Sequence, residues 1–148
     1  MYRIMICDDD AVSVSKISAI VESVFSNRNV ILHTFTQADQ ISARLLSGCD
    51  IALLDVDLQS NICNGMDLAR RIRSFRKDTV IIFITNFIEY APEGYEVRAF
   101  RYVLKSNMDH LKTCLIKTAG FILLPKFHCK FQSFRWKNKR TSERRKSK

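Results

Sequence analysis

The sequence predicts an α/β fold in which a five-stranded parallel β-sheet carries helices on both faces. Short apolar runs alternate along the chain with longer stretches in which apolar residues recur every three or four positions. That alternation is typical of β-α-β units that build a parallel sheet. The chain has 148 residues, of which 47% are hydrophobic and 26% charged, and this suits one globular domain with a tail.

Five short apolar runs account for the predicted strands. They contain many β-branched and aromatic residues, which favour extended structure. In chain order, the predicted strands are Arg3–Cys7, Val30–Phe35, Ile51–Leu54, Val80–Ile84 and Phe100–Leu104.

Helices are predicted between and after these strands. A second helix is predicted over Gln37–Leu46 and a fourth over about Pro92–Val97, where the proline suits a first helical turn. The pair Asn64-Gly65 predicts a loop before the third helix. Apolar stripes at helical spacing, which we expect to pack on the sheet, are Val14, Ile17, Val21 and Val24 in the first helix, Leu68, Ile72 and Phe75 in the third, and Met108, Leu111, Leu115 and Ile122 in the last.

Polar residues stand where four of the predicted strands end. Asp8 follows the first strand, Asp55 the third, Thr85 the fourth and Lys105 the fifth. In sheets of this kind, ligands bind outside the carboxyl ends of the strands, at the point where the strand order reverses. These four residues are therefore the first candidates for a functional site.

Four segments around these residues resemble the signature segments of response-regulator receiver domains. They are IMICDDD at residues 4–10, LLDVDL at 53–58, FIT at 83–85 and YVLK at 102–105, and the resemblance covers about residues 2–122. The residue types at 57–69 and 84–91 are similar to those of receivers of the LytTR class, including the accessory-gene-regulator type. Those relatives carry a LytTR DNA-binding domain after the receiver, and we expect this chain to lack it.

The resemblance implies a flavodoxin-like, doubly wound sheet with the strand order 2-1-3-4-5. In that order the third strand lies between the first and the fourth, so Asp55 is about one strand spacing, ~4.8 Å, from Asp8 and Asp9 on one side and from Thr85 on the other. Lys105 is two spacings away and must reach back. Three carboxylates this close repel one another, and a hard divalent cation such as Mg²⁺ would compensate.

The resemblance also assigns roles to these residues. Asp55 would be phosphorylated by a sensor histidine kinase with Mg²⁺ as cofactor, and slow autodephosphorylation would follow, so the domain is a signalling module rather than an enzyme. A conformational switch would then control an output, with transcription expected. The implied metal ligands are Asp9, Asp55, Asp8 partly through water, and the backbone carbonyl of Asp57. Lys105 and Thr85 would assist transfer of the phosphoryl group. Thr85 and Tyr102 would form the conformational switch.

Other interpretations remain open at this point. Asp8 to Asp10 could form a solvated loop, and Asp10 is interpreted as a helix cap rather than a ligand. Asp55-Val56-Asp57 also resembles the nucleophile motif of haloacid-dehalogenase phosphatases, although Gln59 stands where that motif has Thr or Val. A stand-alone receiver that docks on a protein partner is a further alternative. Three departures from the family are Ser106 in place of the usual proline, Asn86 in place of a small residue, and a segment after the fifth helix, from Gly120 onward, that is unlike a known effector domain.

The excess positive charge lies at the end of the chain. Residues 126–148 hold 10 of the 24 basic residues but Glu143 alone among the acidic ones, and we expect the tail at 123–148 to be partly disordered. DNA contact would need this tail or an effector domain, and a homodimer would use the face of the fourth helix and fifth strand. The five scattered cysteines indicate neither disulfides nor a zinc site. Without a membrane-spanning run or signal sequence, we expect a cytoplasmic protein without membrane contact.

Overall fold

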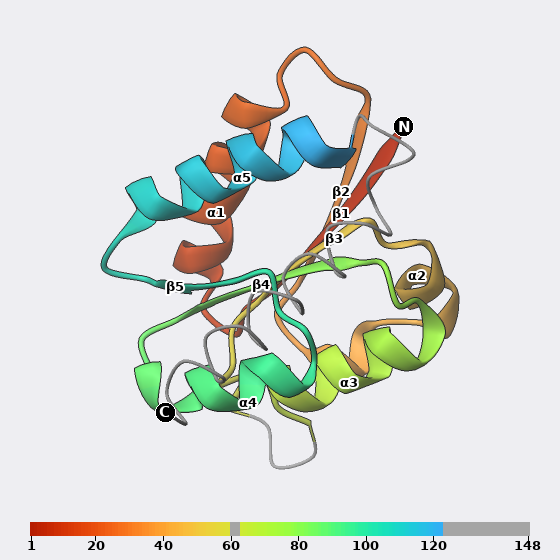
Figure 1. Cartoon of the computed structure of the whole chain (residues 1–148), viewed down its shortest axis with the longest axis vertical. Coiled ribbons are helices and arrows are strands. Elements are labelled where there is room, and N and C mark those ends of the chain that lie inside the picture. Colours follow the sequence, from red (N-terminus) through yellow and green to blue (C-terminus); the bar gives the residue numbers. More distant parts are fainter. Residues whose placement is uncertain (60–62, 123–148) are drawn as a thin grey trace, which may run out of the picture.

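The computed structural model describes residues 1–59 and 63–122. Its sheet has the order β2-β1-β3-β4-β5 with all neighbouring strands parallel, which confirms the predicted fold class (Figure 1). The predicted tail at 123–148 lies outside the described residues. The strands are β1 (Tyr2–Cys7), β2 (Val30–Phe35), β3 (Ile51–Leu54), β4 (Val80–Thr85) and β5 (Arg101–Leu104).

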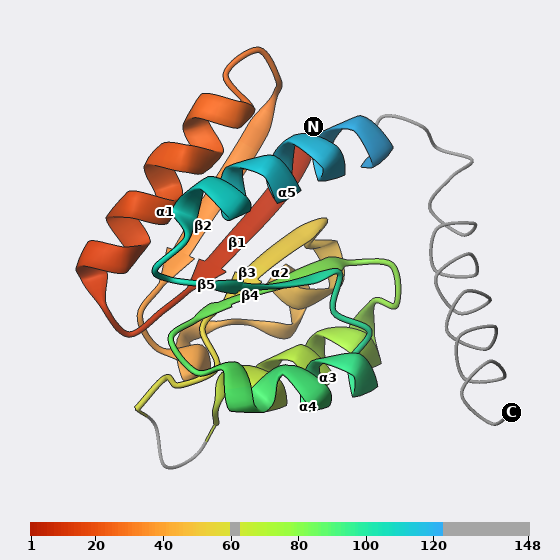
Figure 2. The same cartoon turned by 60° about the vertical axis from the view of Figure 1, so that its left-hand side comes forward.

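Helices cover the sheet on both sides, so the fold has three layers. α1 and α5 lie together on one face, and α2, α3 and α4 lie on the other (Figures 1 and 2). Among the described residues, no helix is both long and apolar enough to cross a membrane. The helices are α1 (Ala11–Val24), α2 (Ala43–Gly48), α3 (Gly65–Phe75), α4 (Ala91–Glu96) and α5 (Met108–Ile122), with 3-10 turns at Ala38–Gln40 and Ile88–Tyr90.

Alternation along the central strands divides the interior into two apolar clusters. In β1, Met5 and Cys7 face the cluster under α2, α3 and α4, whereas Ile4 and Ile6 face the cluster under α1 and α5. All four side chains are fully buried. Because both faces of β1 and β3 are buried, these strands read as continuous apolar runs rather than as alternating ones.

The predicted second helix is wrong in detail. The segment Gln37–Leu46 is divided into a 3-10 turn and the short helix α2, with Ile41 and Ser42 in extended conformation between them. The Ser42 hydroxyl accepts a hydrogen bond from Leu45 N–H and so starts a new helix. Elsewhere the predicted bounds are confirmed to within one residue: β2 and β3 match at both ends, and β5 begins at Arg101 rather than Phe100.

The apolar stripe predicted for the third helix is also partly wrong. Leu68 and Ile72 are buried as expected, but Phe75 is 49% exposed. Phe75 is the last residue of α3, and the chain turns into extended backbone at Arg76. Arg76 then takes the inward position, with Nη1 3.1 Å from the carbonyl oxygen of Cys49. A polar contact therefore closes this end of α3 in place of the aromatic ring.

Side-chain caps fix the starts of the two helices nearest the site. Asp10 is the N-cap of α1 and accepts a hydrogen bond from Val12 N–H, which confirms its interpretation as a cap. Asn64 and Asp67 form a capping box at α3, in which each side chain accepts from the other residue's backbone N–H. The loops that follow β1 and β3 thus lead into helices with defined starts.

The side chain of Arg73 ties α3 to the turns around it. Its guanidinium donates to the carbonyl oxygens of Val97 at 2.7 Å, Thr79 at 2.7 Å, Lys77 at 3.1 Å and Arg98 at 3.1 Å. Arg98 has a φ of 54°, in the left-handed region that non-glycine residues seldom occupy. Burial, together with the charge of Arg98, lowers the pKa of Arg73 to about 10. One guanidinium thus satisfies the backbone of two separate turns.

We expect Arg73→Ala to lower the free energy of unfolding by about 3 kcal/mol, because it leaves the partly buried carbonyls of Val97 and Thr79 without their donor. Urea denaturation of the two proteins measures this difference. Arg70→Ala is the matched control on the same helix, because all the ion pairs that Arg70 makes with the described residues are exposed. This substitution should cost less than about 1 kcal/mol. Equal losses in the two variants would contradict this role of Arg73.

Candidate functional site

The strand register brings the first two candidate residues together. Cys7, the last residue of β1, pairs with Leu54, the last residue of β3. The residues that follow them, Asp8 and Asp55, therefore lie side by side. The Asp55 N–H donates to the carbonyl oxygen of Cys7 at 2.9 Å and holds this arrangement. The parallel sheet therefore dictates the proximity that the sequence predicted.

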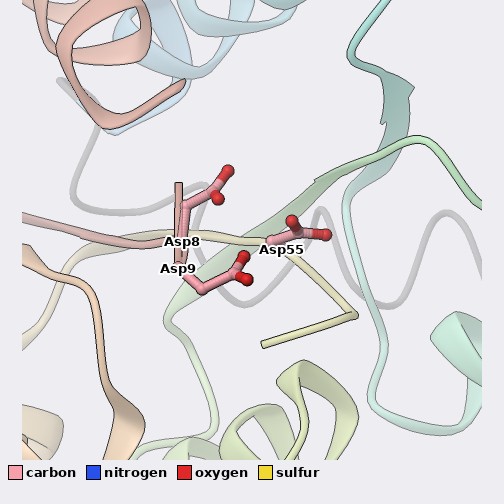
Figure 3. A group of neighbouring side chains, drawn as sticks. All are labelled: Asp8, Asp9 and Asp55. Atoms are coloured by element: carbon pink, nitrogen blue, oxygen red, sulfur yellow. The ribbon is translucent and has the colours of Figure 1, made fainter. Parts of the chain in front are cut away.

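Three carboxylates meet at this edge of the sheet. Asp8 and Asp9 come from the segment after β1 and Asp55 from the end of β3 (Figure 3). One oxygen from each residue lies within 4.8 Å of one from each of the others. Asp8 is 1% exposed and Asp55 6%, whereas Asp9 is half-buried. Oxygen ligands in such a cluster fit a hard divalent cation.

Lys105 reaches this cluster from the end of β5. Its Nζ lies 2.8 Å from Asp55 Oδ2 and 2.8 Å from Asp8 Oδ2. Its own N–H donates to the carbonyl oxygen of Thr85 at 2.9 Å, so the backbone of β4 fixes the start of the side chain. Burial disfavours the charged amine, but the two carboxylates outweigh this effect and raise the pKa of Lys105.

Asp8 is the most buried member of the cluster. Its Oδ1 accepts from the backbone N–H of Asp10 at 2.9 Å. Its Oδ2 is fully buried and accepts no well-directed hydrogen bond within the described residues, so the contact with Lys105 is chiefly an ion pair. Burial raises the pKa of Asp8, although Lys105 and the Asp10 N–H oppose the shift. A buried carboxylate oxygen with spare acceptor capacity is suited to a cation or its bound water.

The two oxygens of Asp55 have different partners. Oδ2 accepts from Lys105, and Oδ1 accepts a longer hydrogen bond, 3.3 Å, from the backbone N–H of Asp57. The side chain of Asp57 is exposed and accepts from the N–H of Gln59. Asp57 therefore turns its carboxylate away from the cluster, and the role predicted for its backbone carbonyl remains a prediction.

Thr85 and Tyr102, the predicted switch residues, both contact Phe87. Thr85 is fully buried, and its hydroxyl oxygen accepts from the N–H of Phe87 at 3.3 Å. The Tyr102 hydroxyl donates to the carbonyl oxygen of Phe87, and its ring lies 6.0 Å from that of Phe83. Burial raises the pKa of Tyr102 to about 12. Phe87 was not singled out from the sequence, because backbone contacts of this kind leave no signal in residue type.

Gly65 is a further site residue that the sequence marked only as a loop signal. A Cβ atom at this position would lie 1.9 Å from the carbonyl oxygen of Asp55. The N–H of Gly65 donates to the carbonyl oxygen of Val56 at 2.8 Å. The start of α3 thus packs directly on the backbone that carries Asp55, and only glycine fits there.

A family model for the response regulator receiver domain matches residues 4–116. The chain belongs to the response-regulator receiver family. The matched region contains Asp8, Asp9, Asp55 and Lys105, the residues that meet at the edge of the sheet. The receiver domain is a signalling domain of two-component systems, and the match favours neither the phosphatase nor the stand-alone docking module over a response regulator.

Curated relatives place this receiver domain near the LytTR class. The sensory transduction protein LytT of Bacillus subtilis is 26% identical over 106 residues, which is 71% of this chain and 42% of that protein. The transcriptional regulatory protein LytR of Staphylococcus aureus is 26% identical over 103 residues, or 70% of this chain and 41% of the relative. The chain thus covers about four-tenths of the length of these relatives.

Solved receiver domains share the fold. The response regulatory domain of mrkE from Klebsiella pneumoniae superposes with a TM-score of 0.63 at 24% identity, covering 78% of this chain and 90% of that one. A CheY-like receiver from Methanospirillum hungatei gives a TM-score of 0.59 at 19% identity, covering 81% and 98%. Receiver domains bind Mg²⁺ through acidic residues, and the described chain offers Asp8, Asp9 and Asp55 for this purpose.

Substituting Gly65 tests how closely α3 packs on the receiver site, the cluster of Asp8, Asp9, Asp55 and Lys105. We expect Gly65→Ala to lower the free energy of unfolding by about 2 kcal/mol or more, because the added methyl group forces the Asp55 carbonyl to move. Gly120→Ala is the control in α5, where a Cβ would meet nothing within 4 Å and should stabilise the helix by up to about 1 kcal/mol. Thermal and urea denaturation distinguish the two. An equally well tolerated Gly65→Ala would show that this contact is loose.

Removing the ammonium group tests the ion pairs of the receiver site. We expect Lys105→Met to lower the free energy of unfolding by about 3 kcal/mol in EDTA, since it leaves Asp8 and Asp55 without a cation. Lys112→Met, at an exposed position of α5, should change it by less than about 0.5 kcal/mol. If Lys105→Met were as stable as the Lys112 control at neutral pH, the three carboxylates would not need this ion pair.

Proposed function

We propose that Asp55 accepts a phosphoryl group from a sensor histidine kinase in a Mg²⁺-dependent reaction, and that the phosphate switches the domain to control an output. The observation that carries this proposal is the contact of Asp55 with Lys105 at 2.8 Å, inside a cluster of three carboxylates. A carboxylate held by an ammonium group is positioned to attack phosphorus while its charge is balanced. Membership of the receiver family supports the same assignment.

The proposed transfer moves one phosphoryl group between two side chains. One oxygen of Asp55 forms a bond to phosphorus, and the bond between phosphorus and the imidazole nitrogen of the kinase breaks. The imidazole keeps the electron pair and takes a proton, and Asp55 becomes an acyl phosphate. Because phosphoryl transfer requires mainly positioning and neutralisation of charge, Lys105 supplies one positive charge at Asp55 Oδ2.

The charge balance of the site supports a divalent cation. Asp8, Asp9 and Asp55 carry three negative charges when ionised, and Lys105 is the cation that contacts them among the described residues. Two negative charges are left over, which a doubly charged ion neutralises. Direct ligands would be Asp9 and Asp55, with Asp8 partly through water and the backbone carbonyl of Asp57. When bound, Mg²⁺ would neutralise the oxygens of the incoming phosphoryl group.

The proposed switch uses the contacts that converge on Phe87. If the Thr85 hydroxyl turns toward a phosphoryl oxygen, it gives up its bond with the Phe87 N–H. The carbonyl oxygen of Phe87 accepts a hydrogen bond from Tyr102 of β5. A shift of the loop at Phe87 would therefore move the Tyr102 side chain. Phe87 is 41% exposed and Tyr90 is 37% exposed, and the surface they share with α4 and β5 would change. A homodimer or a partner on that surface would respond.

Transcription is the output that the relatives suggest. LytR of Staphylococcus aureus is named a transcriptional regulatory protein, and this chain matches only its receiver part. We propose that the receiver controls transcription in the same way. Contact with DNA would come from an effector domain or from the basic residues of 126–148, which lie outside the described part of the chain.

Phosphorylation by acetyl phosphate tests the assignment of Asp55. Intact-mass measurement should detect one added phosphoryl group on the wild-type chain in Mg²⁺ and none in EDTA, and hydroxylamine should remove it, as it does an acyl phosphate. Asp55→Asn should gain none. Asp109→Asn removes the same charge from an exposed position of α5 and should behave as the wild type. Equal labelling of Asp55→Asn and wild type would overturn the proposal.

A further inference from the structure

A cleft opens between α2 and the part of the sheet formed by β1 and β2. Its volume is about 270 Å³. Two pairs of neighbouring strand residues line it, because Arg3 lies beside Ile31 and Met5 beside His33 in the strand register. Leu45 of α2 lines the other side. The apolar side chains of Ile31 and Leu45 therefore lie next to the basic residues Arg3, His33 and Arg44 in this cleft.

The cleft exists because α2 is short. The chain bends at Ser42, so that α2 covers only Ala43–Gly48 and leaves part of the sheet without a helix above it. β2 is an edge strand, and His33 and Ile31 on it are only half-buried. The cleft thus results from the bend in the backbone at Ser42. Its lining residues come from two strands of the sheet and from α2 and the residues next to it.

The charged groups in the cleft are all of one sign. Arg3 from β1 and Arg44 from α2 both line it, and no acidic residue of the described part of the chain does. Among residues 1–59 and 63–122, neither guanidinium has a carboxylate within ion-pairing distance. Asp50 is nearby, since it accepts from the backbone N–H of Arg3, but its side chain pairs with Arg76 at 3.0 Å. Arg3 and Arg44 therefore line the cleft without a counter-ion from the described part of the chain.

We propose that this cleft binds a small organic phosphate, whose dianionic group contacts Arg3 and Arg44 and whose apolar part lies on the half-buried side chains of Ile31 and Leu45. Guanidinium groups match phosphate oxygens in charge and in the planar arrangement of their donors. The imidazole of His33 offers a further donor or acceptor. The volume of about 270 Å³ is just below the usual range for small-molecule sites, so a monoester with a compact apolar group is the class that fits.

This site is separate from the phosphoacceptor site. Arg3 stands near the start of β1 and Asp8 follows its end, which puts about 17 Å of strand between them. The ligand would contact α2, β2 and the start of β1, which carry none of the residues proposed for phosphoryl transfer. The inference therefore stands independently of the function proposed for Asp55.

Phenyl phosphate is a suitable probe, because it combines a phosphate group with one compact ring. We expect it to cause saturable shifts in the amide NMR signals of Ile31, His33 and Leu45, in EDTA so that the acidic cluster holds no metal. Phenol lacks the charge and inorganic phosphate lacks the ring, so each should bind at least about tenfold more weakly. The spectra also report whether each variant is folded.

The decisive variant carries Arg3→Gln and Arg44→Gln together, and we expect it to bind phenyl phosphate at least about tenfold more weakly than the wild type. Lys16→Gln with Lys112→Gln is the matched control, since it removes two charges from exposed positions of α1 and α5 on the opposite face. The control should bind as the wild type does. Unchanged affinity in the arginine variant, equal losses in both variants, or no saturable shift in the wild type would overturn the proposal. Labelling of Asp55 by acetyl phosphate should be the same in both variants.

Discussion

Three carboxylates held close together at one edge of the sheet are the constraint on which the rest of the structure depends. At a separation of about 5 Å and an effective dielectric of 20, each ionised pair repels by roughly 3 kcal/mol. The register of β1 with β3 fixes the backbones of Asp8 and Asp55, so the carboxylates cannot separate by moving the chain. Lys105, whose Nζ contacts both, offsets part of that repulsion. The remainder explains why the site suits a cation and a phosphoryl group.

The supports of this site are spread over the fold. Gly65 lets the start of α3 approach the carbonyl of Asp55, and the capping box of Asn64 and Asp67 fixes where that helix begins. On the other side, β4 holds the backbone of Lys105 through the carbonyl of Thr85. Each support acts on the backbone next to a functional side chain. The geometry of the site is therefore a property of the packed layers rather than of the loops alone.

Much of this architecture could be predicted from the sequence, because a buried parallel sheet leaves a clear signal. β1 and β3 are apolar on both faces, and the polar residue that ends each of them marks the edge where ligands bind. The strand order came from the resemblance to receiver domains, since residue patterns alone do not specify which strands are neighbours. Given that order, the proximity of Asp8 and Asp55 follows from the strand spacing, and the structure confirms this proximity.

Contacts made by the backbone could not be predicted in this way. The hydrogen bonds of Phe87 to Thr85 and Tyr102 depend on its N–H and carbonyl, which every residue type but proline has. The division of the second helix at Ser42 and the exposure of Phe75 depend on tertiary packing, which overrides local periodicity. The measurement that tests the central claim most directly is calorimetric titration of Mg²⁺ into the wild type, Asp9→Asn and Asp39→Asn. The account predicts one ion per chain, bound more than about tenfold more weakly by Asp9→Asn and equally well by Asp39→Asn, whereas no binding, or equal binding by Asp9→Asn, would contradict it.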